Sequence, residues 1–296
     1  MYVFLLTSST RHWVDVMNAR RLSVPQIRAM KRRRGDAALT MVTAYDEPTA
    51  RIVDAAGVDM ILVGDSVGNV VLGRPDTLSV TIEEMVHHTT AVAAAQPSAL
   101  VVADMPWMSY HVSIEESVRN AASLIRAGAD AVKLEGGMQR VSVIEAIIDA
   151  EIPVMGHLGL TPQSVRAFGG FKVQGKSVEA AHHLLSSAKA IEAAGCFAMV
   201  IEGVPDVLGT EITKASTVPT IGIGAGADTD GQVLVLHDLL GLSGAKPPKF
   251  VRQYVDLADI ATQALKAYVA DVHQGAFPDA TETYSASEEL TTHLQA

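Results

Sequence analysis

The sequence predicts an α/β fold in which eight parallel strands alternate with helices and close into a (βα)8 barrel. Strand-like and helix-like segments alternate about eight times along the chain, a pattern typical of a parallel sheet. Most strand-like segments are continuous apolar runs, as expected for strands that are covered on both faces. Eight such units within roughly 200 residues favour a closed barrel, which typically takes about 250 residues. An open, doubly wound sheet is the alternative.

The predicted strands are short apolar runs that follow a glycine, a proline or a helical segment. Helices are expected over residues 47–56 and 178–194, and after Thr81 and Ser113. Thr81 and Ser113 are each followed three residues later by a glutamate, which is the capping-box pattern. The predicted strands are residues 39–44, 60–63, 100–103, 131–134, 153–156, 197–201, 220–223 and 233–236.

The seventh unit is expected to be irregular. Only nine positions separate Ile223 and Val233, which is too few for a full crossover helix, so this unit must be short or distorted.

One domain is expected over residues 1–296, with the barrel core at about 38–245. An N-terminal helical extension is predicted over residues 24–33, and a C-terminal helical segment over about 248–272, after a proline-rich link. The tail, residues 280–296, is polar and rich in Thr, Ser and Glu, and is expected to be poorly ordered.

Composition excludes several classes of function. The formal net charge of −10 at pH 7 disfavours a nucleic-acid partner. No apolar run reaches the roughly 18 residues that a membrane span needs. The single cysteine, Cys196, permits no intrachain disulfide and lies in an apolar run, so an unreactive, buried thiol is expected. These features predict a soluble cytoplasmic protein with neither a nucleic-acid nor a membrane partner.

An ionisable residue follows or ends each of five apolar runs, beside a glycine or a turn. Because the carboxyl ends of parallel barrel strands share one rim, where the catalytic groups of such barrels lie, these side chains are expected to meet there. Asp46 is a looser sixth case, for which a helix-capping role suffices. The five residues are Asp65, Asp104, Glu135, His157 and Glu202.

Asp65, Asp104 and Glu135 end three successive predicted strands, whose neighbouring ends lie about 5 Å apart in a barrel. Carboxylates at such a short distance repel one another unless something compensates their charge. A shared divalent cation with hard oxygen ligands, such as Mg²⁺, is one such compensation. Alternatively, each acid is only a helix N-cap or a loop residue.

The remaining candidates surround these acids. Lys133 lies two positions before Glu135 in one predicted strand, so both point to the same side. A buried lysine needs an anion, which is either a substrate carboxylate or a neighbouring acid. Glu202 is placed to act as a general base. His157 lines the site, tunes Glu202 or serves as a structural donor. Ser66 offers a hydroxyl and a backbone N–H to a carboxylate oxygen.

Two further patterns carry weaker signals. Residues 222–226 (GIGAG) are similar to a phosphate-cradling loop, but no Lys-Ser/Thr follows as a P-loop requires, so a tight turn is expected. The histidine pairs at 87–88 and 182–183 fall in helical segments, where adjacent side chains diverge by about 100° and cannot share one metal. They are interpreted as surface or packing residues.

Six segments resemble the 3-methyl-2-oxobutanoate hydroxymethyltransferase (ketopantoate hydroxymethyltransferase) family of pantothenate biosynthesis. They occur in unbroken order within roughly residues 40–254, whereas residues 1–22 and the acidic tail match no part of the family that can be placed. The segments are residues 63–66 (VGDS), 103–106 (ADMP), 132–137 (VKLEGG), 156–165 (GHLGLTPQSV), 169–175 (GGFKVQG) and 221–226 (IGIGAG).

The resemblance implies a TIM barrel of the phosphoenolpyruvate/isocitrate-lyase kind that assembles as a homodecamer. It implies Mg²⁺ dependence and transfer of a hydroxymethyl group from 5,10-methylenetetrahydrofolate to 3-methyl-2-oxobutanoate, giving 2-dehydropantoate. It implies that Asp65, Asp104 and Glu135 form the metal site, Glu135 partly through water. The implied contacts of the keto acid are Asp65, Ser66, Asp104 and Lys133, with His157 lining the site and Glu202 as proton acceptor.

Two other functions are compatible with these residues. One is a Mg²⁺-dependent C–C lyase or mutase on a related barrel, although the apolar surroundings of Cys196 argue against a cysteine-using lyase. The other is a barrel that only binds a metabolite or a partner.

Overall fold

The computed structural model describes residues 21–31, 36–244 and 247–296. Its strands close into one barrel in sequence order, and each pairs in parallel with its neighbours. The closed barrel is therefore confirmed over the open sheet. The strands are β1 (Leu39–Thr43), β2 (Met60–Val63), β3 (Leu100–Asp104), β4 (Ala131–Glu135), β5 (Val154–Gly159), β6 (Ala198–Glu202), β7 (Thr220–Ile223) and β8 (Gly231–Leu234).

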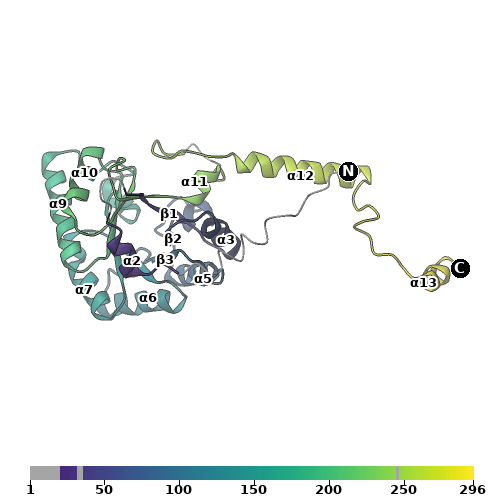
Figure 1. Cartoon of the computed structure of the whole chain (residues 1–296), viewed down its shortest axis with the longest axis horizontal. Coiled ribbons are helices and arrows are strands. Elements are labelled where there is room, and N and C mark those ends of the chain that lie inside the picture. The colour runs from purple at the N-terminus through teal and green to yellow at the C-terminus, as the bar shows by residue number, and fades with distance from the viewer. Residues whose placement is uncertain (1–20, 32–35, 245–246) are drawn as a thin grey trace. The chain divides into compact units, whose positions relative to one another are not determined.

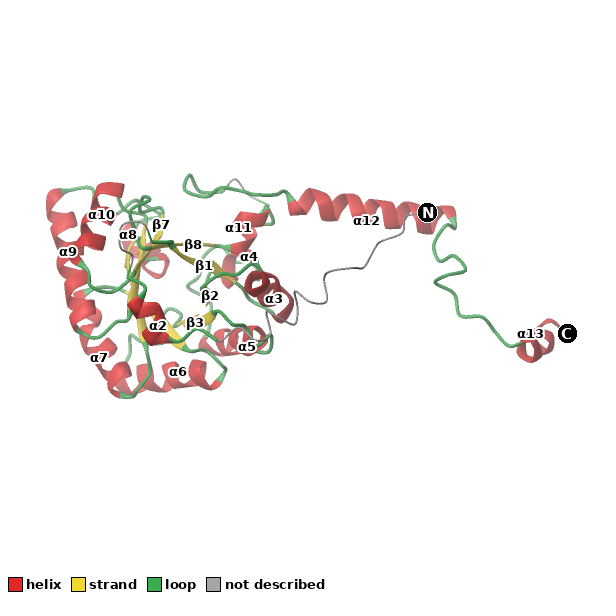
Figure 2. Ribbon diagram, in the orientation of Figure 1, coloured by secondary structure: helices red, strands yellow, loops and turns green. Residues whose placement is uncertain are grey.

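Helices alternate with the strands and lie around the outside of the barrel (Figures 1 and 2). Residues 224–230, all of them described, contain no helix, so the predicted irregularity of the seventh unit is confirmed. The helices are α3 (Glu47–Ala55), α4 (Val67–Val70), α5 (Ile82–Ala93), α6 (Ile114–Arg126), α7 (Val141–Asp149), α8 (Val165–Phe168), α9 (Val178–Ala193) and α10 (Asp206–Ala215), with 3-10 turns η1 (Met138–Arg140) and η2 (Pro162–Ser164).

Local capping chemistry starts these helices where the sequence predicts. The Thr81 side chain accepts a hydrogen bond from Glu84 N, and the Glu84 carboxylate accepts one from Thr81 N, which completes a capping box at α5. Ser113 caps α6 by accepting from Glu116 N. After α6, Gly128 takes a φ of +110°, and a Cβ there would lie 2.4 Å from Ala93 Cβ, so glycine is required.

Apolar side chains close the amino end of the barrel and leave the carboxyl end for polar residues. Helix α2 (Val24–Ala29) buries Ile27 in a cluster with residues from the starts of the strands, among them Leu39, Leu100 and Ala131. The predicted helix over 24–33 ends at Ala29, and its residues 32 and 33 lie outside the described part of the chain.

The C-terminal segment forms a second compact unit. One unit runs to Leu236 and includes Pro248–Val251, and the other comprises His237–Pro247 and Arg252–Ala296. The prediction of a single domain stays a prediction. Within the described residues, no helix is both long enough and apolar enough to cross a membrane.

One prediction for this segment was wrong in detail. The helical segment does not begin near residue 248; α12 (Leu257–Gln274) begins after Asp256, whose side chain accepts a hydrogen bond from Asp259 N. The tail contains a helix, α13 (Glu288–Gln295), because Ser287 caps it and Glu288 and Glu289 favour its positive amino end. The short helix α11 (Leu236–Leu240) precedes both.

Candidate active site

The structure brings all seven predicted site residues into one cavity of about 100 Å³ at the carboxyl end of the barrel. Strand pairing places them, since Asp104 is in register with Lys133, and Glu135 with His157. Along β4, the alternation of side chains turns Lys133 and Glu135 to the same side, as predicted. The seven residues are Asp65, Ser66, Asp104, Lys133, Glu135, His157 and Glu202.

Lys133 and Asp104 form a buried ion pair at the centre of the cavity. Lys133 Nζ lies 2.8 Å from Asp104 Oδ1, and each side chain is 5% exposed. Asp104 Oδ2 also accepts a hydrogen bond from Asp65 N at 3.0 Å. Burial by itself lowers the pKa of Lys133, but Asp104, Glu135 and Asp65 outweigh it and raise that pKa, so the ammonium stays charged.

Negative charge exceeds positive charge in this cavity. Among the described residues that line it, Lys133 is the only lysine or arginine, and it faces the carboxyl groups of Asp65, Asp104, Glu135 and Glu202. Burial, then the charges of Asp104 and Glu135, raise the pKa of Asp65 well above its ordinary value. The site therefore favours an added cation, a proton or a ligand that relieves this repulsion.

His157 connects Glu202 to the group formed by Lys133 and the acids. Its Nε2 lies 3.1 Å from Glu202 Oε2, and its Nδ1 lies 3.5 Å from Glu135 Oε1 and 3.2 Å from Lys133 Nζ. A protonated Nδ1 donates to Glu135, whereas an unprotonated Nδ1 accepts from Lys133, so the two contacts exclude each other. Burial and Lys133 lower the pKa of His157, but hydrogen bonds to Glu135 and Glu202 prevail and raise it to about 9. The charged ring, which lies close to both acids, is therefore favoured at neutral pH.

Ser66 hydrogen-bonds a buried tyrosine that no sequence pattern marked as a site residue. The Tyr45 hydroxyl lies 2.8 Å from Ser66 Oγ. Burial raises the pKa of Tyr45, so its hydroxyl keeps its proton. The adjacent Asp46 caps α3 by accepting from Thr49 N at 2.8 Å, which confirms its predicted capping role.

Gln163 and Tyr110 hold two of the acids and were missed by sequence reasoning. Gln163 Nε2 donates to Asp65 Oδ2 at 2.9 Å and to Met105 O at 3.0 Å, while its backbone N donates to Glu135 Oε2 at 3.0 Å. The Tyr110 hydroxyl donates to Gln163 Oε1 at 2.5 Å and accepts from Glu135 N at 3.1 Å. Both side chains are buried and uncharged, so no excess of charge in the sequence marked them.

The acids fit Mg²⁺ in donor chemistry and in charge. Carboxylate oxygens are the hard donors that this ion prefers, and the surplus of buried negative charge calls for a cation. Within the described residues, however, no group of three or more His, Cys, Asp or Glu side chains is placed to hold a metal ion. Asp65 instead accepts from the Gln163 amide, Glu135 accepts from Gln163 N, and Asp104 pairs with Lys133 and accepts from Asp65 N.

The other patterns of the sequence have structural roles. Cys196 is buried, and burial raises the pKa of its thiol to about 12, as expected for an unreactive cysteine. Residues 222–226 leave β7 in a turn in which Gly224 has a φ of +63°. His88 Nδ1 lies 2.7 Å from Tyr45 O, so this histidine packs against the chain as predicted.

The sequence matches one family of known proteins. Residues 21–280 match the family model described as ketopantoate hydroxymethyltransferase. A 3-methyl-2-oxobutanoate hydroxymethyltransferase of Moorella thermoacetica is 55% identical, over 89% of this chain and 98% of that protein. One of Pelobacter propionicus is 52% identical, over 90% of this chain and 97% of that protein.

Solved structures with low sequence identity share the fold. A phosphoenolpyruvate phosphomutase from Streptomyces platensis subsp. rosaceus has a TM-score of 0.57 at 16% identity, covering 93% of this chain and 95% of that chain. A 2,3-dimethylmalate lyase, described as a member of the PEP mutase/isocitrate lyase superfamily, has a TM-score of 0.55 at 14% identity, covering 92% and 98%. The predicted kind of barrel is therefore confirmed.

Proposed function

Because the chain belongs to the ketopantoate hydroxymethyltransferase family and is a transferase, we propose that 5,10-methylenetetrahydrofolate is its one-carbon donor. In this proposal the acceptor is 3-methyl-2-oxobutanoate. A C–C bond forms at C3 of the keto acid, one water is consumed, and 2-dehydropantoate and tetrahydrofolate are released. The observation that carries the mechanism is the buried surplus of carboxylates beside Lys133 and Glu202.

We place Mg²⁺ at Asp65, Asp104 and Glu135. The hard oxygen donors and the excess negative charge of the cavity support this assignment. A neighbour in fold, a phosphonopyruvate hydrolase, was crystallised with oxalate and Mg²⁺. When bound, the ion supplies positive charge that stabilises the negative charge developing on the keto oxygen. The family resemblance implies that Glu135 acts partly through water.

The chain's own residues bind the keto acid and move its proton. Lys133 neutralises the substrate carboxylate or the developing enolate charge. Ser66, hydrogen-bonded to Tyr45, lines the cavity and offers its hydroxyl to the same carboxylate. Glu202 removes the C3 proton. His157 Nε2 lies 3.1 Å from one Glu202 oxygen, so the other oxygen is free of this contact and is the one proposed to take the proton.

The test is the first half of the reaction, proton exchange at C3 of the keto acid in deuterated water without any one-carbon donor. Glu202→Gln should slow this exchange at least about 10²-fold, the contribution of a general base, while binding of the keto acid persists. Glu145→Gln, an exposed change on α7, is the matched control and should exchange at the wild-type rate. Wild-type exchange in Glu202→Gln would exclude Glu202 as the base.

We also propose that identical chains assemble, with a decamer as the expected state. The second compact unit supports an assembly, because α12 buries none of its residues and exposes apolar side chains such as Ile260, Leu265 and Tyr268.

A further inference from the structure

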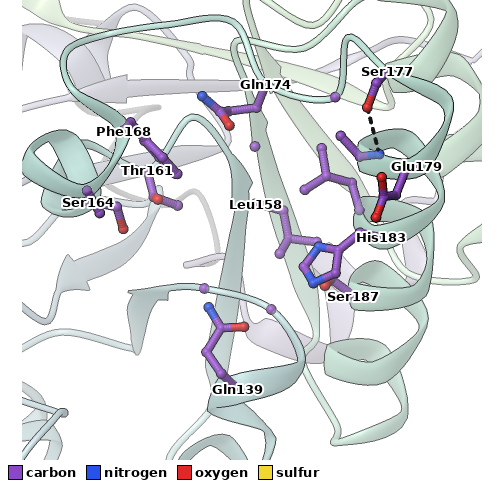
Figure 3. Close-up of a pocket in the computed structure, with 17 residues that line it drawn as sticks. Gln139, Leu158, Thr161, Ser164, Phe168, Gln174, Ser177, Glu179, His183 and Ser187 are labelled. Carbon is purple, nitrogen blue, oxygen red and sulfur yellow. Dashed lines mark hydrogen bonds between the residues drawn. The ribbon is translucent and has the colours of Figure 1, made fainter.

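A second and larger cavity, of about 500 Å³, lies on the outer side of the barrel wall. Its walls come from strand β5, helices α8 and α9, the turn after β4, and the loop that leads into α9 (Figure 3). The volume falls within the range of about 300–1,000 Å³ that is usual for small-molecule sites.

The two cavities lie on opposite faces of the same strand. His157 lines the barrel cavity, and the next residue, Leu158, lines the second one, because adjacent side chains of a strand point in opposite directions. Beyond the strand end, Thr161 lines the second cavity and Pro162 lines the first. A ligand seated outside therefore needs only to cross the carboxyl end of β5 to reach the barrel cavity.

The two cavities differ in volume and therefore suit substrates of different size. The barrel cavity, at about 100 Å³, suits a small keto acid and is far too small to take a pteridine as well. A bisubstrate reaction at this site thus needs a second compartment for the body of the larger substrate. The outer cavity is about five times larger and shares the strand end at which the reacting carbon must arrive.

The lining combines apolar walls with a polar stripe. Leu158 and Leu184 supply apolar surface on two sides. Glu179, His183 and Ser187 follow one another at intervals of four positions on α9, so they form one stripe that faces the cavity (Figure 3). This spacing explains why His183 lines the cavity, while its neighbour His182 does not.

Ser187 gives independent evidence that a polar ligand belongs there. Its side chain is 1% exposed, and its Oγ has no hydrogen-bond partner within the described residues. A buried hydroxyl without a partner destabilises the protein, and a ligand able to hydrogen-bond would offset this cost. A purely apolar occupant would leave that cost in place.

We propose that this outer cavity binds the pteridine ring of the one-carbon donor, an inference that rests on the donor assigned in the proposed function. The ring is planar, so it packs between Leu158 and Leu184. Its edge carries amino and amide groups, to which the Glu179 carboxylate and the Ser187 hydroxyl are suited as acceptors. The one-carbon unit then extends over the end of β5 toward the keto acid.

The test measures binding of tetrahydrofolate to the full-length chain by calorimetry, in the presence of the keto acid and Mg²⁺. Ala180→Trp, which places an indole in the cavity, should raise the dissociation constant for tetrahydrofolate at least tenfold. His183→Ala should raise it about threefold, whereas His182→Ala, one position away on the same helix, should leave it unchanged. Proton exchange at C3 of the keto acid should stay at the wild-type rate in all three variants.

Each outcome decides one question. Wild-type affinity for tetrahydrofolate in both Ala180→Trp and His183→Ala would overturn the cavity assignment. Equal losses in His182→Ala and His183→Ala would overturn it too, because only one of them lines the cavity. A wild-type protein that exchanges the C3 proton but does not bind tetrahydrofolate would instead refute the donor named in the proposed function.

Discussion

Aspartates occur at both ends of the barrel, but their surroundings differ. At the amino end they accept hydrogen bonds from the backbone of neighbouring strands. Asp59 accepts from Thr40 N and Thr40 Oγ1, both at 2.8 Å. Asp230 accepts from Thr220 N at 2.7 Å and pairs with Lys31 at 2.7 Å. These carboxylates hold the starts of neighbouring strands together, and the donors that they contact compensate their negative charge.

At the carboxyl end the acids face one another instead. Asp65, Asp104 and Glu135 are all buried, and together with Glu202 they carry more negative charge than Lys133 and the protonated His157 can balance. The raised pKa of Asp65 is the electrostatic consequence. Acidic residues therefore have two different roles at the two ends of the barrel. An acid saturated by backbone donors stabilises the fold, whereas an acid left in excess is available to a cation and a substrate.

The largest expected loss of turnover follows from a substitution at the carboxyl end of the barrel. Asp104→Asn keeps an acceptor for Asp65 N but removes the charge that pairs with Lys133. Formation of 2-dehydropantoate should fall at least about 10²-fold, the usual loss when one preorganised electrostatic contact is removed. Steady-state kinetics measure this loss, with circular dichroism to verify folding. Unchanged turnover would mean that the charge of Asp104 has no part in catalysis.

A smaller effect is expected from the neutral residues that hold the acids. Gln163→Ala removes the amide that contacts Asp65, although its backbone N still donates to Glu135. Turnover should fall about 10- to 100-fold, and more Mg²⁺ should be needed for half-maximal activity. Tyr110→Phe leaves both Gln163 donors in place and should lose less. If Tyr110→Phe costs more than Gln163→Ala, the amide is not the principal support.

The smallest effect on catalysis is expected at the amino end. Asp230→Ala removes the acceptor of Thr220 N and the ion-pair partner of Lys31, which keeps its hydrogen bond to Thr213 O, and should lower the free energy of unfolding by about 1–3 kcal/mol. Turnover per folded molecule should not change. Urea denaturation measures the first quantity, and Asp149→Ala, an exposed change on α7, should stay within about 0.5 kcal/mol of wild type. A large loss of kcat in Asp230→Ala would mean that the two ends are not separate in function.

Much of the site was predictable because barrel topology converts position in the sequence into position in space. Once eight strands run parallel, every carboxyl end lies on one rim, so Asp65, Lys133 and Glu202 had to meet. Strand boundaries were also accurate, since apolar runs and capping residues are local signals. Two strands are exceptions. β5 ends at Gly159 rather than Gly156, because it pairs with β6 as far as Glu202. β8 begins at Gly231 rather than Val233, because its start pairs with Leu39 of β1, far away in sequence.

The sequence by itself thus determined the barrel, the rim and the ionisable residues on it, because apolar periodicity, capping and strand ends are written in neighbouring positions. Only the tertiary structure decided which donors those acids share. Gln163 reaches Asp65 across 98 positions, and Tyr110 reaches Gln163 across 53. It also decided that His183 lines a cavity whereas His182 does not. Hydrogen bonds between uncharged groups and the volume between packed elements depend on distances in space, and no local pattern of residues encodes them.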